Sequence, residues 1–202
     1  MADRELRADA RRNRELVLQT AQQLFAAEGL DVPLDEIARR AGVGPGTVHR
    51  HFPAKEALYL AVAVDMLRGL VAEAAVLVAG DDPEAVYTLL SRMIASGAQN
   101  AAVKSALAAA EFDLRTAAPD IAADLTRLVT DLLDRAHRAG VARSDVTPDE
   151  ALALVAGAFA AINYAGAAND RGRSAHLCQI ILDGLRPRRR TRASAAGGGL
   201  VS

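Results

Sequence analysis

Hydrogen-bond donors gather in one short stretch of this sequence, Gly42–Lys55, which contains no acidic residue. They comprise a hydroxyl, two imidazoles, a guanidinium and an ammonium group, on Thr47, His49, His51, Arg50 and Lys55. Such groups suit phosphate oxygens and the edges of bases, and without nearby carboxylates their positive field is not cancelled. The chemistry that this stretch predicts is contact with a nucleic acid.

Two short helices must position these donors. Leu34–Ala41 places small apolar side chains on one helical face, Gly42 breaks that helix, and Pro45 suits the start of a second one. On the second helix Val48 and Phe52, four residues apart, share the inward face and leave the donors outside. Two helices joined by a tight glycine turn predict a helix-turn-helix that enters the major groove of double-stranded DNA.

The segments before this motif predict a further helix. Met1–Asn13 is charged and lacks an apolar face, so we expect a frayed arm, whereas Arg14–Glu28 has helical apolar spacing and Gly29 ends it. Arginines at this junction predict either a phosphate clamp or a solvated arm: Arg11, Arg12 and Arg14. Pro33 suits the first turn of the next helix, with Asp31 or Val32 before it.

The segment Leu16–Leu58 resembles the N-terminal DNA-binding domain of the TetR family of bacterial regulators. The matching pieces are Leu24-Phe25, Gly29, Ile37-Ala38, Ala41-Gly42-Val43, Gly46-Thr47-Val48, His51-Phe52 and Lys55-Glu56-x-Leu58. The resemblance implies a homodimeric, all-helical protein of the repressor type whose C-terminal domain binds a small molecule.

The resemblance also implies roles for single residues. Thr47, His51 and Lys55 match positions that usually meet phosphates, although His51 could instead be a structural cap against Phe52. Arg50 occupies a variable position that reaches bases or phosphates. The remaining matches are His49, where the family most often has Tyr, and the variable start of the recognition helix, Gly44 and Pro45. Pro33 departs from the family pattern, in which a phosphate-binding Thr is common.

Composition supports the same fold class. Alanine and leucine dominate the 202 residues and Trp is absent, which favours an all-α protein with a sizeable core. We expect no membrane span and a cytoplasmic protein, because no long uncharged apolar run and no signal-peptide core occurs. The single Cys178 and scattered histidines predict no disulfide, metal site or cofactor.

Charge is distributed unevenly along the chain. Residues 1–55 carry a net charge of +1, residues 56–185 carry −7 from 10 basic and 17 acidic side chains, and residues 186–202 carry +5. The overall charge of −1 therefore does not argue against nucleic-acid binding.

Helical patterns continue through the C-terminal part. Apolar periodicity and breaks predict helices at 54–78, 84–96, 119–139, 151–167 and 174–185, with an Ala-rich segment at 100–116. Asp81 or Asp82 would cap the second of these before Pro83, and Thr147 with Glu150 would form a capping box for the fourth. We expect an arm and helix-turn-helix domain at 1–53, a helical effector-binding and dimerisation domain at 54–185, and a disordered Arg-rich tail at 186–202.

The last two helices have too much apolar surface for one protomer to cover with ease. The helix 151–167 is apolar nearly all round, so we expect it to pair with the next helix and with the same pair in a partner. The resemblance agrees, because this family usually dimerises through a four-helix bundle; an ordinary monomeric core is the alternative. The predicted interface residues are Leu154, Gly157, Ala158, Ala161, Leu177, Ile180 and Ile181.

A ligand site has weaker support in the sequence. Three features indicate where a ligand could bind: polar groups within apolar helices, a possible ion pair between residues four apart, and adaptable Met and Phe side chains. These candidates are Met66, Met93, Glu111, Phe112, Arg115, Phe159 and Asn163. The alternative is that they belong to the core or border the dimer interface.

The sequence therefore predicts a ligand-responsive DNA-binding regulator, with repression favoured over activation, and not an enzyme. Its partners would be double-stranded DNA, an unknown small-molecule effector and a second copy of the chain. Two alternatives stay open: a protein that coats DNA without an effector, and an all-helical enzyme that carries this N-terminal pattern.

Overall fold

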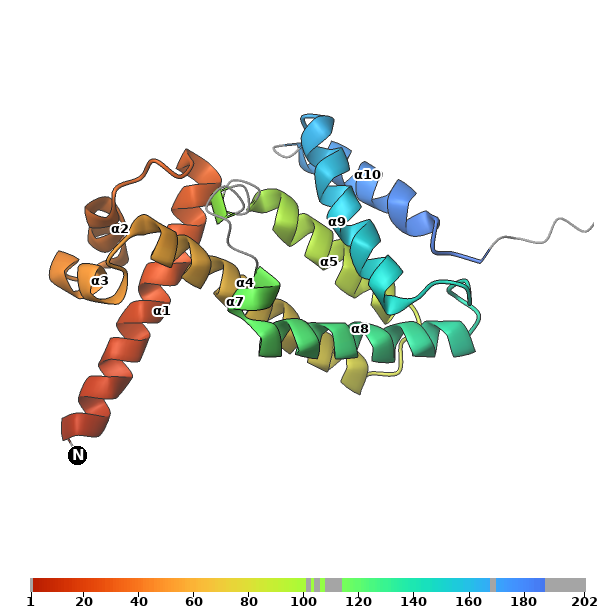
Figure 1. Ribbon diagram of the computed structural model, residues 1–202, viewed down its shortest axis with the longest axis horizontal. Coiled ribbons are helices and arrows are strands. Elements are labelled where there is room, and N and C mark those ends of the chain that lie inside the picture. Colours follow the sequence, from red (N-terminus) through yellow and green to blue (C-terminus); the bar gives the residue numbers. More distant parts are fainter. Residues whose placement is uncertain (1, 101–102, 104–105, 108–113, 168–169, 188–202) are drawn as a thin grey trace, which may run out of the picture.

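The computed structural model describes residues 2–100, 103, 106–107, 114–167 and 170–187, and in these residues it contains helices and no strand. The expected all-α class is therefore confirmed. Figure 1 shows a small N-terminal lobe and a larger C-terminal lobe, with one long helix, α4 (Lys55–Ala79), running between them. The N-terminal lobe contains α1 (Ala2–Glu28), α2 (Leu34–Ala41) and α3 (Pro45–His51).

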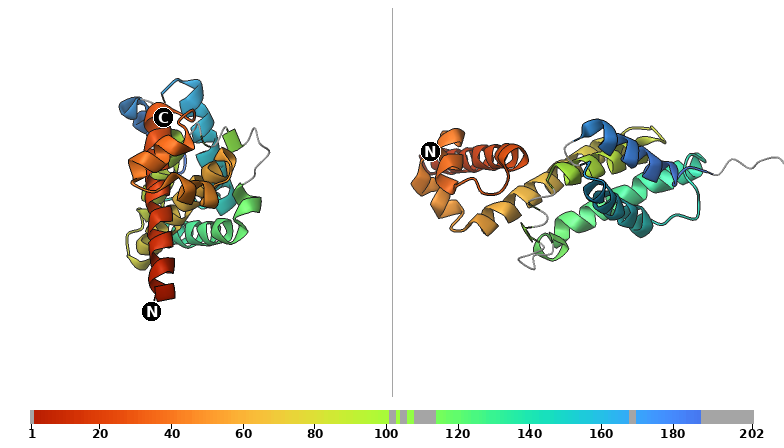
Figure 2. Two further views of the ribbon diagram at one scale, coloured as in Figure 1. Left: turned by 90° about the vertical axis from the view of Figure 1, so that its left-hand side faces the viewer. Right: turned by 90° about the horizontal axis from the view of Figure 1, so that it is seen from above.

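The C-terminal lobe is a layered helical body. Its further helices are α5 (Ala85–Gln99), α7 (Leu114–Ala117), α8 (Pro119–Arg138), α9 (Pro148–Tyr164) and α10 (Arg171–Asp183). The view from above in Figure 2 shows α4 and α8 lying along each other, and Figure 1 shows α5, α9 and α10 on one side of this pair. No helix of the described segments is long and apolar enough to cross a membrane.

Two separate hydrophobic cores meet along α4. Its first half supplies Leu58 and Val62 to the core of the N-terminal lobe, and its second half supplies Leu70 and Ala74 to the core of the C-terminal body. The packing thus changes from one core to the other inside this helix, downstream of the domain boundary expected at residue 53. A rigid helix shared by two cores is a direct mechanical connection between them.

Several helix boundaries differ from the expected ones. Helix α1 continues through residues 2–13, where we expected a frayed arm. Pro33 is the N-cap of α2 and not a first-turn residue: its ψ of 149° is extended, and its carbonyl accepts from the N–H groups of Glu36 and Ile37 at 3.1 Å. The sequence pattern missed these because each depends on backbone hydrogen bonds across a boundary.

The start of α9 follows the expected chemistry, whereas the starts of α5 and α10 differ from it. At α9 the capping box is confirmed, with Thr147 N–H donating to Glu150 Oε2 at 2.8 Å and Glu150 N–H to Thr147 Oγ1 at 3.2 Å. At α5 the prediction of Asp81 or Asp82 as the N-cap is wrong: Glu84 is the N-cap, and Asp82 Oδ1 accepts from the Glu84 N–H at 2.9 Å in the turn before the helix. Asp170 starts α10 earlier than expected by accepting from the Arg173 N–H at 3.0 Å.

Candidate nucleic-acid interface and effector cavity

The turn between α2 and α3 has the geometry that its sequence predicts. Gly42 adopts φ 68° and ψ 26°, a left-handed conformation that most side chains disfavour, and thereby ends α2. The chain then reverses so that Val43 N–H donates to the Ala38 carbonyl at 3.0 Å and the Val43 side chain is buried. This turn fixes the angle at which α3 leaves α2.

Helix α3 is only 7 residues long and depends on its neighbours for stability. Gly44 is its N-cap and Pro45 its first residue, while Val48 and the C-cap Phe52 are almost completely buried. On the Phe52 ring lies the guanidinium of Arg14 from α1, 5.6 Å from the ring centroid. Packing from both sides therefore holds α3 at the outer edge of the lobe (Figure 1).

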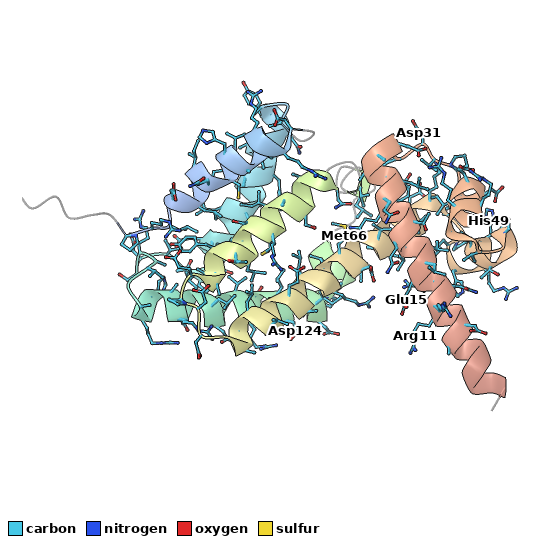
Figure 3. All side chains as sticks on the ribbon, turned by 180° about the vertical axis from the view of Figure 1, so that it is seen from behind. Arg11, Glu15, Asp31, His49, Met66 and Asp124 are labelled. Carbon is cyan, nitrogen blue, oxygen red and sulfur yellow. The ribbon has the colours of Figure 1, made fainter. Side chains whose placement is uncertain are left out.

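The donors of α3 face outward, as expected. His49, Arg50 and His51 are exposed and Thr47 is half-buried. The His49 ring is held by α2, because its Nε2 lies 2.9 Å from Asp35 Oδ1. Figure 3 shows His49 at the far end of the N-terminal lobe, away from the C-terminal body. The sequence interpretation missed Asp35; a carboxylate fourteen positions before a histidine gives no periodic signal.

Lys55 has a structural partner that was not expected. Its Nζ donates to the Leu30 carbonyl at 3.1 Å, and the Tyr59 hydroxyl donates to the same oxygen at 3.0 Å. These bonds tie the first turn of α4 to the loop between α1 and α2. Burial raises the pKa of Tyr59, and the nearby carboxylates of Glu56 and Asp31 raise it further.

The cations of α2 are engaged in ion pairs on the protein surface. Glu36 accepts from Arg39 Nε at 2.8 Å and from Arg40 Nε at 2.7 Å, and Arg40 also reaches Glu28 at 3.2 Å. The hydrogen bonds from Arg39 and then Arg40 lower the pKa of Glu36 to about 2. Within the described part of the chain, Arg12 and Arg50 have no such partner, so their charges are available to a ligand.

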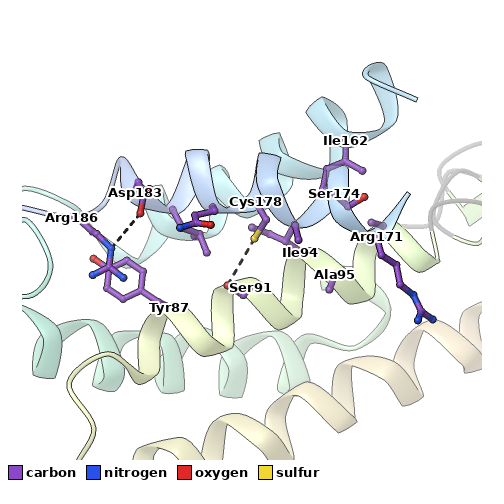
Figure 4. A pocket seen from close by; sticks show the side chains of 14 residues that line it. Tyr87, Ser91, Ile94, Ala95, Ile162, Arg171, Ser174, Cys178, Asp183 and Arg186 are labelled. Atoms are coloured by element: carbon purple, nitrogen blue, oxygen red, sulfur yellow. Dashed lines mark hydrogen bonds and ion pairs between the residues drawn. The ribbon is translucent and has the colours of Figure 1, made fainter. Parts of the chain in front are cut away.

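A cavity of about 560 Å³ lies between α5, α9 and α10 (Figure 4). Its wall is mostly apolar and is interrupted by Ser91 and Cys178, whose Oγ and Sγ lie 3.9 Å apart. Burial raises the pKa of the Cys178 thiol, which keeps it neutral. A second hollow of about 430 Å³ lies between α1, α4 and α5 and includes Gln22, Asp65 and Met66. Among the described residues, no group of three or more metal-ligating side chains occurs.

Comparisons with known proteins agree with this architecture. Residues 17–62 match the family described as bacterial regulatory proteins, tetR family, and residues 81–187 match the C-terminal domain described as transcriptional regulator SbtR-like. A TetR regulatory protein from Mycobacterium vanbaalenii is 43% identical, with 90% of this chain and 99% of that chain covered and a TM-score of 0.70. This chain belongs to the TetR family.

Two further relatives support this TetR-family assignment. A TetR regulator from Streptomyces coelicolor is 31% identical, with 87% of this chain and 99% of that chain covered and a TM-score of 0.66. An HTH-type transcriptional regulator from Staphylococcus aureus is 39% identical over 54 residues, which are 26% of this chain and 29% of that protein. The chain thus matches under a third of the length of such curated relatives.

In this TetR-family protein, the predicted ligand residues do not gather around the large cavity. Met93 is buried in the core, the Phe159 ring packs on Gly97, and Asn163 is exposed. Met66 lines the second hollow. Outside the described residues lie Glu111, Phe112 and the side chain of Arg115. Periodicity placed these side chains on helices but could not tell which helix faces would separate to leave a space.

The cavity residues that the sequence interpretation missed include the first residue of the expected tail, Arg186. Arg186 pairs with Glu84, its Nη2 lying 3.0 Å from Oε2, and stacks 4.3 Å above the Tyr87 ring. Arg186 therefore belongs to the folded body, although we expected the disordered tail to begin there. The remaining tail, residues 188–202, lies outside the described residues. Ser91 and Cys178, isolated within apolar helical runs, were the signals available in the sequence.

The residues predicted for the dimer interface lie mostly on the surface of the protomer. Leu154, Gly157 and Ile180 are exposed, and half-buried positions are Ala161, Leu177 and Ile181. Ala158 is an exception: it is fully buried in the core of its own protomer, so it is not available to a partner. Tyr164 on the same helix is 97% exposed.

Proposed function

We propose that this protein is a homodimeric, ligand-responsive regulator of transcription that binds double-stranded DNA through α3 and represses the genes it controls. The observation that carries the proposal is the exposed, acid-free face of α3 on a helix-turn-helix whose inward residues are buried. An arginine with no carboxylate partner among the described residues, Arg50, is suited to a guanine edge or a phosphate. Such a regulator would act in the cytoplasm, where bacterial DNA lies.

Dimerisation is supported by the exposed apolar face of the C-terminal lobe. Leu154 and Ile180 are 39% and 55% exposed, and the exposed Gly157, three residues after Leu154 on α9, permits close helix approach. A two-fold dimer through α9 and α10 would present two copies of α3 to half-sites one or more DNA turns apart, roughly 34–36 Å per turn. The operator would then be nearly palindromic.

Effector response is supported by the cavity and by α4. A mostly apolar cavity of about 560 Å³ falls in the range of small-molecule sites, roughly 300–1,000 Å³. Because α4 is packed in both cores, a ligand that shifts the C-terminal body also moves the N-terminal lobe that holds α3. The effector would favour the state in which the two copies of α3 no longer match the half-site spacing.

Fluorescence anisotropy with duplexes selected from random DNA by the protein tests this proposal. We expect specific binding with a footprint of one palindrome, and loss of base discrimination in Arg50→Ala. The matched control is Arg68→Ala, an exposed arginine in the middle of α4. Failure to select any duplex at moderate salt, or diffuse protection along DNA, would contradict a sequence-specific regulator.

A further inference from the structure

The cavity between α5, α9 and α10 has two ends with different charge. At one end Arg186 is neutralised by Glu84 and by Asp183, whose Oδ1 lies 3.3 Å from its Nε. At the other end stands Arg171, the first residue of α10, exposed and without a carboxylate partner in the described part of the chain. Figure 4 shows these two arginines at opposite ends of the row of lining side chains.

The neighbouring acid does not neutralise Arg171. Asp170 is the N-cap of α10, and its Oδ1 accepts from the backbone N–H of Arg173 at 3.0 Å. The Asp170 carboxylate offsets the positive end of the α10 dipole, so the charge at this end of the cavity comes from the Arg171 guanidinium. One end of the cavity thus offers an uncompensated cation beside a hydrophobic wall.

Between its ends the cavity is lined mainly by apolar side chains. Ile94, Ala98, Ile162 and Leu182 line it with buried side chains. Four polar side chains also line it: Ser91, Ser174, Cys178 and Gln179. Ser91 and Cys178 contact each other, and the Ser174 hydroxyl donates to the Ala167 carbonyl. From Arg171 to Leu182 the helix rises roughly 16 Å at about 1.5 Å per residue, a length that suits an extended alkyl chain.

We propose that the effector is an anionic amphiphile, a medium-chain carboxylate whose head binds Arg171 and whose chain lies along this apolar wall. The guanidinium would bind the carboxylate in the bidentate arrangement that makes such pairs strong. This inference rests on the proposed function for its regulatory meaning, but the binding itself can be measured without DNA.

The position of the cavity on α10 leaves it open in the proposed dimer. Helical spacing puts Arg171, Cys178 and Leu182 on one side of α10, and Leu177 and Ile180 on the opposite side. The ligand would therefore lie between α10 and α5, on the side of α10 away from the partner. Occupancy would set the distance between the dimer helices and the body that carries α4.

Isothermal titration calorimetry with dodecanoate, below its micelle concentration and on the full chain, tests the proposal. We expect one site per protomer, and binding at least tenfold weaker in Arg171→Gln, as expected when a charge-assisted pair is lost. The matched control is Arg173→Gln, which removes an arginine of the same helix that does not line the cavity and should change affinity less than twofold. A second variant, Ala175→Phe, fills the cavity from the exposed side of α10 and should abolish binding with the melting temperature retained.

The head group is tested with dodecanol and dodecyltrimethylammonium, which keep the chain and change the charge. Dodecanol should bind at least tenfold more weakly than dodecanoate, and the cation should not bind. Three outcomes would each overturn the proposal. The first is equal affinity for all three compounds, and the second is an equal loss of dodecanoate affinity in Arg171→Gln and Arg173→Gln. The third is that protein which binds its selected DNA does not bind dodecanoate. That last outcome leaves the DNA-binding function intact, whereas dodecanoate binding without specific DNA binding overturns the proposed function alone.

Discussion

The imidazole of His49 on α3 is held by the carboxylate of Asp35 on α2, with Nε2 and Oδ1 2.9 Å apart. Both side chains are largely exposed. Figure 3 shows His49 at the end of the N-terminal lobe. One helix of the motif thus orients a donor on the other. The contact also places a negative charge beside the surface proposed to meet DNA. It therefore orients the His49 ring but weakens the electrostatic attraction between this surface and DNA.

Replacement of this carboxylate separates its two effects. In Asp35→Ala we expect tighter binding to non-specific duplex, because a negative charge is lost, and weaker discrimination, because His49 is released. The ratio of specific to non-specific affinity should fall several-fold, corresponding to about 1 kcal/mol for one hydrogen bond. Anisotropy titrations with both duplexes measure it. Asp35→Asn keeps an acceptor and should retain more discrimination; an unchanged ratio in Asp35→Ala would exclude a positioning role.

The ion-pair network of α2 predicts a pH dependence of stability. Hydrogen bonds from Arg39 and Arg40 lower the pKa of Glu36 from 4.5 to about 2. A carboxyl whose pKa is depressed on folding stabilises the folded state above its unfolded pKa, and this contribution is lost as pH falls from about 4.5 towards about 2. The free energy of unfolding, measured with urea, should differ less between pH 7 and pH 3 in Glu36→Gln than in the wild type. An equal pH dependence in both proteins would contradict the assignment.

Close packing of α5 on α9 requires a glycine. A Cβ on Gly97 would lie 2.1 Å from Cε1 of the Phe159 ring, so Gly97→Ala forces the ring or the helices apart. We expect a loss of about 1–3 kcal/mol in the free energy of unfolding, typical of overpacking. In the control Gly69→Ala no atom lies within 4 Å of the new Cβ, and the higher helix propensity of alanine should stabilise α4 by up to about 1 kcal/mol.

A double-mutant cycle identifies the ring as the cause. Phe159→Leu in the Gly97→Ala background should recover part of the lost stability, although the same change in the wild type costs stability. Additive losses from the two changes would contradict direct contact.

The proposed dimer face predicts at which surface position an introduced aspartate prevents dimerisation. Ile180→Asp puts a charge into the apolar face of α10 and should give a monomer in light scattering coupled to size-exclusion chromatography. The matched control Val76→Asp changes a 73% exposed apolar residue of α4 and should leave the dimer intact. If both variants remain dimers, the interface lies on another face of the protein.

The local features of this protein could be predicted because they depend on neighbours in the chain. The glycine turn at Gly42, the buried pair Val48 and Phe52, and the capping box at Thr147 follow from backbone conformation and helical spacing over a few residues. The outward direction of Arg50 follows in the same way. For these, the sequence by itself determined both the element and the face.

Contacts between distant segments were decided by the tertiary structure alone. Three such contacts join residues up to 102 positions apart: Asp35 with His49, Lys55 with the Leu30 carbonyl, and Arg186 with Glu84. Likewise the cavity exists because α5 and α10 do not pack fully against each other, a result of crossing angles and side-chain volumes summed over the whole body. Helical periodicity states which residues face inward. Which inward faces meet, and where they leave a space, is determined only when all the helices pack together.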